Sequence, residues 1–546
     1  MTICDRLPNF RVMKRIYITP ECLSLPVGSG IIVLLSILIT LLSAESAHSQ
    51  GAHIHVAEES TGFAIAQLQL RGYMLSLNPT DLPYSDAVIV AAITEVDRNL
   101  LSPTELRWLN LVQATVSDMH SEEGAAVIGI RVEGGLKASN NERLDVLRYL
   151  DSDETGLWPH VKIQPRFSVG GFAAAIGGRH DVYYDKDPDG IDSALRLFMR
   201  AEDAYVRYES RWFSASIARI QRHWGQYGEE STIVSSNPRS YDQIGFTLGH
   251  GRLRLRSTLG ELDSITGDNE YTGLAGEDPS GSKRRYLAAS RLDWRPNQNL
   301  TVTALQSVLY SGENSNLSLK FLNPLLPVVL SLNNTPKNDE NNGFLGFAVW
   351  HRFKKTAFYI QTTLDDFDII NLNEPSSFAV TGSVSFMDVI ARSTLQVGGT
   401  VVSARTYNTH QVEGQYVYLL RGIATQFSDY ISGYARIEIF ADALIPGLTV
   451  SPGVYLLLQG QADIRTVPFP SEDETGTILS GTVESTVRPS VRIRYDPSPL
   501  FFFSTDLGIN FTTNDEHIAN TYATRFVGLA QFGLKIALDG HMPLSF

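Results

Sequence analysis

Residues 252–256 read Arg252-Leu253-Arg254-Leu255-Arg256, so that charged and apolar side chains alternate strictly. Successive side chains of a β-strand point to opposite faces of a sheet, whereas a helix repeats its apolar positions every three or four residues. The stretch therefore predicts a strand that carries arginines on one face and leucines on the other. Such a strand would separate a polar environment from an apolar one.

The same period of two recurs from about residue 162 onward. In residues 285–295 one face carries Arg285, Arg291, Asp293 and Arg295 and the other carries Tyr286, Ala288, Leu292 and Trp294. The windows 378–386, 487–495 and 501–511 sort in the same way. An apolar outer face and a polar inner face are what a transmembrane β-barrel requires.

Three further features favour a membrane barrel over a water-soluble β-sandwich. Long polar connections are expected at 267–283, 332–342 and 468–477, and the chain ends on the aromatic Phe546. Aromatic residues also fall at expected strand ends, where membrane barrels carry girdles; they are Tyr183, Tyr184, Trp294, Tyr310, Trp350 and Tyr495. We expect residues 156–546 to form an all-β transmembrane barrel of about 16–18 antiparallel strands.

The first 49 residues have the order of a secretory signal peptide. A basic stretch precedes an apolar run over 31–42, which is followed by Ala47-His48-Ser49. The run is shorter than the roughly 20 residues of a transmembrane helix. We therefore expect cleavage after Ser49. Both cysteines, Cys4 and Cys22, lie in this leader, so the exported part would contain no thiol.

Residues 50–155 are expected to form a small α-helical periplasmic domain in front of the barrel. They hold seven basic and sixteen acidic residues, within a chain whose net charge is −14. This acidity argues against nucleic acid or an anionic membrane surface as a partner. Ser85 and Asp86 stand where a helix could be capped, and Ser102-Pro103-Thr104-Glu105 has the pattern of a capping box.

Inward-facing arginines are the main chemical feature of the predicted barrel. Nine are expected on inner faces: Arg252, Arg254, Arg256, Arg285, Arg291, Arg295, Arg488, Arg492 and Arg494. They could bind the carboxylate, sulfate or phosphate groups of an acidic glycan. Alternatively they pair with lumenal acids such as Glu261, Asp293 and Glu438. Trp224, flanked by Arg222 and His223, suits sugar stacking. The alternative, which we favour, is a tryptophan that packs an interface or a plug.

Catalytic and metal chemistry find no support in the sequence. It lacks a Gly-x-Ser-x-Gly elbow, a phosphate-binding glycine loop and metal-spaced histidines. Asp365, Asp366 and Asp368 lack the glycine and distal glutamate of a calcium loop. His223 and His351 have no partner serine and acid in a recognisable pattern. We expect no enzymatic activity, no cofactor and no metal.

Several short motifs, in order over residues 70–370, resemble the capsule assembly Wzi family. They are Leu82-Pro83-Tyr84-Ser85, His223-Trp224-Gly225, the segment 233–239 ending in Asn237-Pro238-Arg239, Leu322-Asn323-Pro324-Leu325, the segment 341–346, and the strand 359–364 running into Asp365-Asp366-Phe367. The resemblance implies an outer-membrane barrel with a periplasmic helical part, acting as a surface lectin that holds capsular or exported polysaccharide.

The predicted function is therefore binding or anchoring of capsular or exported polysaccharide at the cell surface. A porin-like diffusion channel for anions or sugars is the alternative. The candidate glycan-binding residues are Arg222, Trp224, Asn237, Arg239, Arg252, Arg254, Arg256 and Arg492. We expect a monomer in the outer membrane, in contact with its lipid and with a capsular or exopolysaccharide, and without a nucleic-acid partner.

Overall fold

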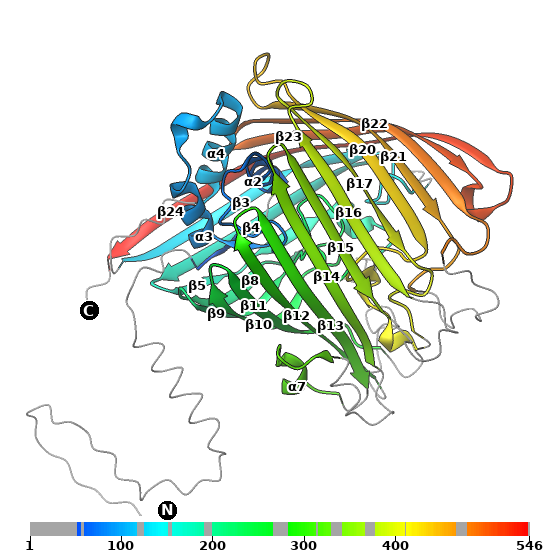
Figure 1. Ribbon diagram of the computed structural model, residues 1–546, viewed down its shortest axis with the longest axis horizontal. Coiled ribbons are helices and arrows are strands. Elements are labelled where there is room, and N and C mark those ends of the chain that lie inside the picture. The colour runs from blue at the N-terminus through cyan, green and yellow to red at the C-terminus, as the bar shows by residue number, and fades with distance from the viewer. Residues whose placement is uncertain are drawn as a thin grey trace, which may run out of the picture. The chain divides into compact units, whose positions relative to one another are not determined.

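A closed ring of antiparallel strands forms the wall of the protein in this computed structural model (Figure 1). The structure describes residues 52–55, 59–116, 125–150, 156–190, 199–265, 282–312, 315–328, 341–365, 377–409, 411–465 and 478–543. The expected signal peptide with Cys4 and Cys22, the acids Asp366 and Asp368, the terminal Phe546 and most of the three long connections lie outside these residues.

The wall strands follow one another around the ring in chain order. They are β3 (Ala125–Ser139), β4 (Gly156–Val169), β5 (Phe172–Ala175), β6 (Gly178–Asp181), β7 (Arg200–Ala201), β8 (Ala204–Glu209), β9 (Phe213–Ile220), β10 (Tyr241–His250), β11 (Leu253–Glu261), β12 (Arg284–Asn297), β13 (Leu300–Gly312), β14 (Asn341–Phe353), β15 (Thr356–Leu364), β16 (Phe378–Met387), β17 (Ser393–Val402), β20 (Tyr430–Phe440), β21 (Leu448–Gln459), β22 (Glu484–Ser498), β23 (Phe501–Thr513) and β24 (Tyr522–Pro543).

The ring closes where β24 pairs with β3. Strands β5 and β6 both pair with β4, so together they occupy one position in the wall. Strand β8 pairs with β5 and strand β7 pairs with β6, so β7 and β8 together occupy the next position. The described residues thus form an 18-strand barrel, which confirms the expected fold class and strand number. None of the helices in the described ranges has the length and apolar character that a membrane-spanning helix needs.

The alternation read from the sequence gives the faces of the wall. Leu253 is 53% exposed on the outer face, whereas Arg285 and Arg488 are fully buried on the inner face. Two details differ from expectation: Arg252 lies exposed in the turn before β11, and Glu261 shares the outward face of Leu253 at the far end of that strand. Both residues lie at strand ends, where alternation along the strand no longer determines whether a side chain faces the lumen.

The expected aromatic girdle is found only in part. Trp294 is 53% exposed on the outer face. By contrast, Trp350 and Tyr183 are buried inside the barrel, where Tyr183 stacks on Trp158 with ring centroids 4.9 Å apart. An aromatic residue near a strand end can therefore pack inside the lumen as well as lie at the membrane interface.

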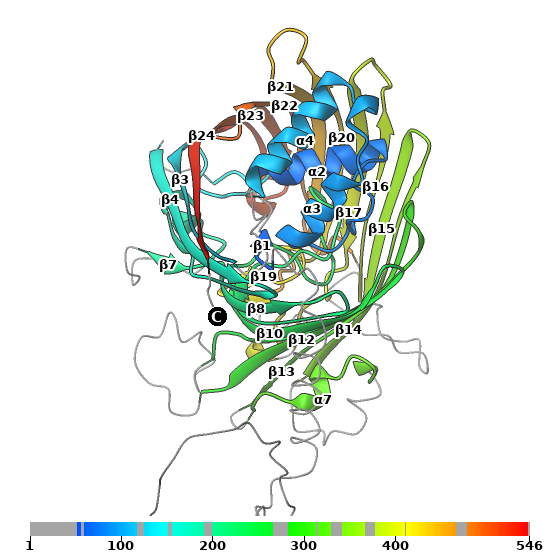
Figure 2. The ribbon, with the colours of Figure 1, turned by 90° about the vertical axis from the view of Figure 1, so that its left-hand side faces the viewer.

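The remaining elements are short. The helices are α2 (Glu59–Arg71), α3 (Asp86–Thr94), α4 (Pro103–Thr115), α5 (Val182–Lys186) and α7 (Leu319–Leu322), with 3-10 turns at Arg98–Leu100, Val412–Gly414 and Asp515–His517. Two small hairpin sheets pair β1 (Ile54–His55) with β2 (Tyr84–Ser85) and β18 (Val417–Tyr418) with β19 (Arg421–Gly422). In Figure 2, α2, α3 and α4 lie within the ring of strands.

The wall begins earlier in the chain than residue 156. Strand β3 lies within the range 50–155, which the sequence analysis assigned to the helical part, yet it pairs with both β24 and β4. Its outward residues Ile128 and Ile130 alternate with the inward Arg131, but Gly134 and Gly135 interrupt the pattern because they carry no side chain. The helical segment itself ends with α4 at Thr115.

Candidate functional site

The lumen is filled from both ends. At one end, α2, α3 and α4 share an apolar core with Phe440 of β20. This is the end with the short turns 251–252, 298–299, 354–355 and 499–500. There Arg352 donates to the carbonyl of Leu70 at 2.7 Å and Arg295 to that of Ser76 at 2.8 Å. We call residues 59–116 the helical plug.

At the opposite end, two long connections fold inward to form what we call the loop plug, residues 221–240 and 403–429. The side chains of Tyr407 and Tyr416 donate to the carbonyls of Thr232 and Ile233, at 2.5 and 2.8 Å. The buried cluster around them includes Trp224 and Phe344. The loop plug therefore has an apolar core of its own, inside the barrel.

The two plugs meet directly. Leu82 and His223 exchange two backbone hydrogen bonds of 3.0 Å each. These residues belong to two of the motifs that carry the family resemblance, Leu82–Ser85 and His223–Gly225. The motifs thus mark the contact that holds the two plugs together.

Beside this contact lies a lumenal cavity of about 490 Å³, which we call the arginine cavity. Its charged lining residues are Arg222, Arg436, Arg492, Arg494, Glu229 and Glu438. Four guanidinium groups thus face two carboxylates, and Phe63 and Tyr227 add aromatic surface. A cavity of this size lies within the range of about 300–1,000 Å³ typical of ligand pockets.

The guanidinium groups of the arginine cavity are held by neighbours on the wall and on the helical plug. Arg492 donates to Asp506 at 3.1 Å while 38% of its side chain stays exposed. Arg494 lies over the ring of Phe63, 4.2 Å from its centroid. Arg436 donates to Gln396 at 2.7 Å. Fixed in this way, the arginines lose little conformational entropy on binding an anion.

A second cavity, of about 470 Å³, adjoins the first and is called here the tyrosine cavity. Its aromatic lining residues are Tyr184, Phe427, Tyr430, Tyr434 and Tyr455. Two of its five acidic lining residues are engaged by arginines, Asp187 by Arg421 and Asp189 by Arg148 among others. Aromatic faces beside polar groups are suited to sugar rings, because a ring has apolar C–H faces and a polar edge.

The two cavities share one wall, made of Gly228, Glu229, Ser236 and Arg436. Glu229 accepts hydrogen bonds from the hydroxyl of Tyr434 and, at 2.5 Å, from the side-chain amide of Gln396. Burial raises the pKa of Glu229 to about 7, against the opposing effect of Arg436. This carboxyl group therefore changes charge near neutral pH at the boundary between the cavities.

The predicted site residues do not all meet. Arg222 and Arg492 line the arginine cavity and Asn237 lines the tyrosine cavity. Arg254 and Arg256 line a much smaller pocket of about 60 Å³, where Arg256 is paired with Asp81. The structure thus brings three of the eight residues to the two large cavities.

The other three predicted residues have different surroundings. Trp224 is 1% exposed in the core of the loop plug, under the guanidinium group of Arg291 at 5.6 Å. Arg239 is buried in an ion pair with Asp185 at 3.1 Å. Arg252 is exposed in a turn. For Trp224 the contacts are those of the alternative given above, packing within a plug.

Sequence reasoning missed most of the tyrosine cavity. Tyr430, Tyr434 and Arg436 occur at alternate positions of β20 and face the lumen together with Glu438. This alternation is present in the sequence and could have been read there. Glu229 and Glu230 carry no such signal, because the path of a long connection inside a barrel is not encoded by a local period.

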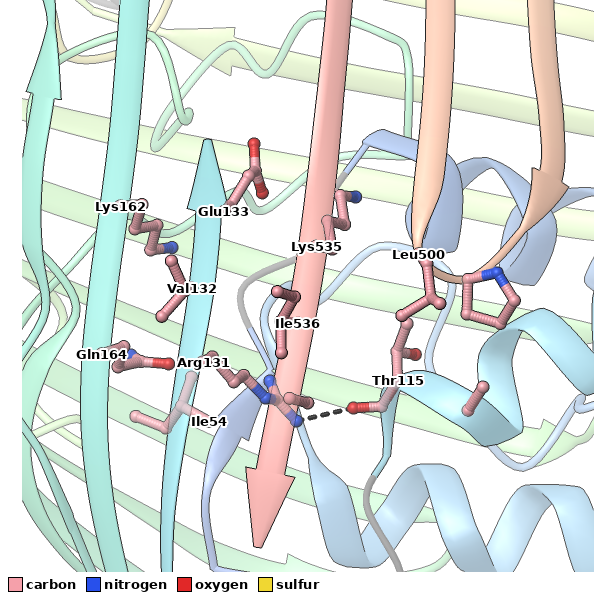
Figure 3. Close-up of a pocket in the computed structure, with 13 residues that line it drawn as sticks. Ile54, Thr115, Arg131, Val132, Glu133, Lys162, Gln164, Leu500, Lys535 and Ile536 are labelled. Atoms are coloured by element: carbon pink, nitrogen blue, oxygen red, sulfur yellow. Dashed lines mark hydrogen bonds between the residues drawn. The ribbon is translucent and has the colours of Figure 1, made fainter. Parts of the chain in front are cut away.

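A third hollow lies on the inner wall near the helical plug. It measures about 300 Å³ and includes Arg131, Glu133, Lys162 and Lys535, on the neighbouring strands β3, β4 and β24. In Figure 3, Arg131 reaches the carbonyl of Thr115, to which it donates at 2.6 Å. Lys162 pairs with Asp203. These charges are engaged in holding the wall and the end of α4.

The sequence offers Asp365 as a candidate for metal binding and His223 as a candidate for catalysis, and both make other contacts in the structure. Within the described ranges, no group of three His, Cys, Asp or Glu side chains is placed to hold a metal ion. Asp365 accepts from the backbone N–H of Tyr407 at 2.7 Å, a structural role at a strand end. His223 is half-buried, and desolvation lowers the pKa of its imidazole to about 4, which keeps it neutral.

The fold is similar to that of a known outer-membrane protein. Wzi of Escherichia coli, described as a carbohydrate-binding β-barrel involved in group 1 capsule assembly, matches with a TM-score of 0.61 and 13% identity, over 90% of this chain and 100% of that one. This confirms the expected resemblance at the level of the fold, an outer-membrane β-barrel.

More distant matches are found among outer-membrane proteins of other bacteria. OccK8 (OprE) of Pseudomonas aeruginosa gives a TM-score of 0.43 at 8% identity, over 76% of this chain and 98% of that one. OccAB4 of Acinetobacter baumannii gives 0.42 at 9%, over 77% and 99%. No family model matches the sequence, and no curated protein matches it.

Proposed function

We propose that this protein is an outer-membrane barrel that binds capsular or exported polysaccharide at the cell surface, with acidic sugar units in the arginine cavity. The observation that carries the proposal is the convergence of Arg222, Arg436, Arg492 and Arg494 on one lumenal cavity whose lining holds two carboxylates, with Asp506 behind Arg492. Guanidinium groups bind carboxylate, sulfate and phosphate oxygens in pairs. The adjoining tyrosine cavity would accommodate the next, uncharged sugar ring.

The likeness to the carbohydrate-binding barrel supports this proposal through the fold, and the orientation of the chain agrees with it. Bacterial outer-membrane barrels have short periplasmic turns and longer external loops. The helical plug lies at the end with the short turns, which are 251–252, 298–299, 354–355 and 499–500. The helical plug would therefore face the periplasm, and the loop plug with the tyrosine cavity would face the outside.

Binding of an acidic polysaccharide by the purified barrel tests the proposal. We expect Arg492→Gln to weaken binding at least several-fold and to reduce its salt dependence, because one exposed guanidinium contact is lost. The control is Arg252→Gln, which removes an exposed arginine outside the cavity. Heat-modifiable mobility on a gel reports that each variant is folded. Equal binding by both variants, or equal binding of the carboxyl-reduced polymer, would contradict the proposal.

The alternative, a diffusion channel for anions or sugars, makes an opposite electrical prediction. A barrel closed by two plugs should show little steady conductance in a planar bilayer while retaining polysaccharide. A large, steady conductance without polysaccharide retention would instead support the channel and remove the glycan-binding function.

A further inference from the structure

One row of outward-facing side chains on the barrel is interrupted by polar residues. The paired positions Phe246, Ser257, Ser290, Gln306 and Leu345 lie side by side on the successive strands β10 to β14. At one flank Leu345 is 41% exposed on the outer surface, as a lipid-facing residue should be. The three polar residues in the middle stand where lipid contact would be costly.

Residues 315–328, which contain α7 and follow β13, cover this polar row from outside. The hydroxyl of Ser257 donates to the carbonyl of Leu322 at 2.9 Å. The side chain of Gln306 donates to the carbonyl of Leu326 at 3.3 Å and accepts from the N–H of Val328 at 3.0 Å. Figure 2 shows α7 outside the ring of strands, next to β13. We call residues 315–328 the strap.

The Leu322-Asn323-Pro324-Leu325 motif shapes the strap. The side chain of Asn323 accepts from the N–H of Leu325 at 3.1 Å, and its carbonyl accepts from the N–H of Leu326 at 3.2 Å. An asparagine that binds the backbone two residues ahead stabilises a tight turn. This turn places the carbonyls of Leu322 and Leu326 toward the polar row.

The inner side of the strap is apolar and packed. Phe321 and Val328 are buried against the outer face of the wall. The ring of Phe321 lies 4.5 Å from that of Tyr310, which in turn stacks on Tyr286 at 5.3 Å. The strap is therefore docked on the barrel wall and forms part of its outer surface.

The outer side of the strap is also apolar. Leu319 and Leu325 are each 80% exposed, and Leu317 is 51% exposed. Leucines this exposed on a docked segment indicate contact with something other than water. On the same outer surface, Leu292 of β12 and Leu345 of β14 belong to the band that contacts lipid chains. The leucines of the strap continue that band over the polar row.

We propose that the strap is seated in the membrane, with Leu319 and Leu325 inserted among the lipid acyl chains of the outer leaflet. The strap covers Ser257, Ser290 and Gln306, so that lipid does not contact them. Its backbone forms hydrogen bonds with Ser257 and Gln306, and its leucines face the bilayer instead. Continuity with the lipid-facing band makes lipid, rather than a second copy of the chain, the occupant. The inference holds whether or not the lumen binds a glycan.

Site-directed spin labelling in lipid vesicles tests this placement. Because the expected mature chain contains no cysteine, a single label is introduced by Leu319→Cys or Leu325→Cys. Reference labels come from Phe347→Cys on the lipid-facing wall, where Phe347 is 48% exposed, and from Ala519→Cys in the exposed turn between β23 and β24. Oxygen collides preferentially with labels in the hydrocarbon, and a water-soluble nickel complex with labels in water.

We expect the ratio of oxygen to nickel collisions at 319 and 325 to match that at 347 and to exceed that at 519 several-fold. A ratio like that at 519 would place the strap in water and overturn the proposal. Collisions with neither reagent, together with spin–spin broadening that grows with the amount of protein per lipid, would show that a second copy covers the leucines. That result would overturn the proposal as well.

Discussion

Individual arginines hold the plugs to the barrel wall. The fully buried Arg285 donates to the carbonyls of Glu413, Gln415 and Val417, at 2.9, 2.5 and 3.0 Å. Arg291 donates to the carbonyl of Thr80 in the helical plug at 2.5 Å. A guanidinium group suits this task because it offers five donors in a fixed plane. Alternation in the sequence places these arginines inward, and the expected pairing with lumenal acids is present for Arg291, which contacts Asp293 at 2.5 Å. It does not reveal that backbone carbonyls of the plugs are partners as well.

The N-cap of α4 provides a prediction at the residue scale. Ser102 accepts from the N–H of Glu105 at 3.4 Å, and Glu105 accepts from the N–H of Ser102 at 2.7 Å, so the expected capping box is confirmed. We expect Ser102→Ala to destabilise this helix by about 1 kcal/mol, because a first-turn N–H loses its acceptor. Limited proteolysis should then cut α4 faster, whereas Ser102→Asp, which keeps an acceptor, should not. Equal cleavage of both variants would show that the cap does not contribute to the stability of the helix.

At the neighbouring helix the cap expectation was only half correct. Ser85 does precede α3, but its hydroxyl donates to Glu209 of β8 at 3.1 Å and makes no bond to the helix. Tertiary contact with the wall has replaced the local cap. Sequence patterns therefore located the start of the helix and missed the partner, since the partner lies 124 residues away.

At the scale of elements, each wall strand has one face toward the membrane lipid and the other toward the lumen. In β11, Leu253 and Leu255 face outward while Arg254 and Arg256 face the lumen. Strands of this kind were predictable because their period of two is local. Strand β3 and the strap were not, since glycines obscure the alternation in the first and the second has no period at all.

The facing of β11 gives a prediction at this scale. A charge on the lipid face near the membrane midplane costs roughly 2–4 kcal/mol. We expect Leu255→Arg to impair assembly into the membrane far more than Arg254→Leu, which loses a lumenal charge at a small pocket. The fraction of heat-modifiable protein in outer-membrane extracts measures assembly. Equal defects in the two variants would refute the assignment of faces.

For the whole molecule, the arrangement of plugs explains why the lumen of a wide barrel is divided into separate cavities. The helical plug enters from the short-turn end, the loop plug from the other, and Leu82 joins His223 between them. The arginine cavity lies beside that junction and the tyrosine cavity lies beyond it, separated by the wall that includes Glu229 and Arg436. The sequence predicted inward arginines but could not predict which of them meet, because Arg222 and Arg492 are brought together only by the closure of the ring and the folding of the loop plug.

Glycan retention by the whole protein should therefore depend on pH. Burial raises the pKa of Glu229 to about 7, so the carboxyl group is mostly neutral at pH 5.5 and mostly charged at pH 8.5. A new negative charge in the wall shared by both cavities repels an acidic glycan, with little screening because the group is buried. We expect affinity for an acidic polysaccharide to fall severalfold across this range in the native protein and to stay nearly constant in Glu229→Gln. Titration calorimetry at both pH values measures the change, and Asp242→Asn, at an exposed acid outside the cavities, serves as the control. A pH dependence that persists in Glu229→Gln would assign the titration to another group and separate the shared wall from glycan binding.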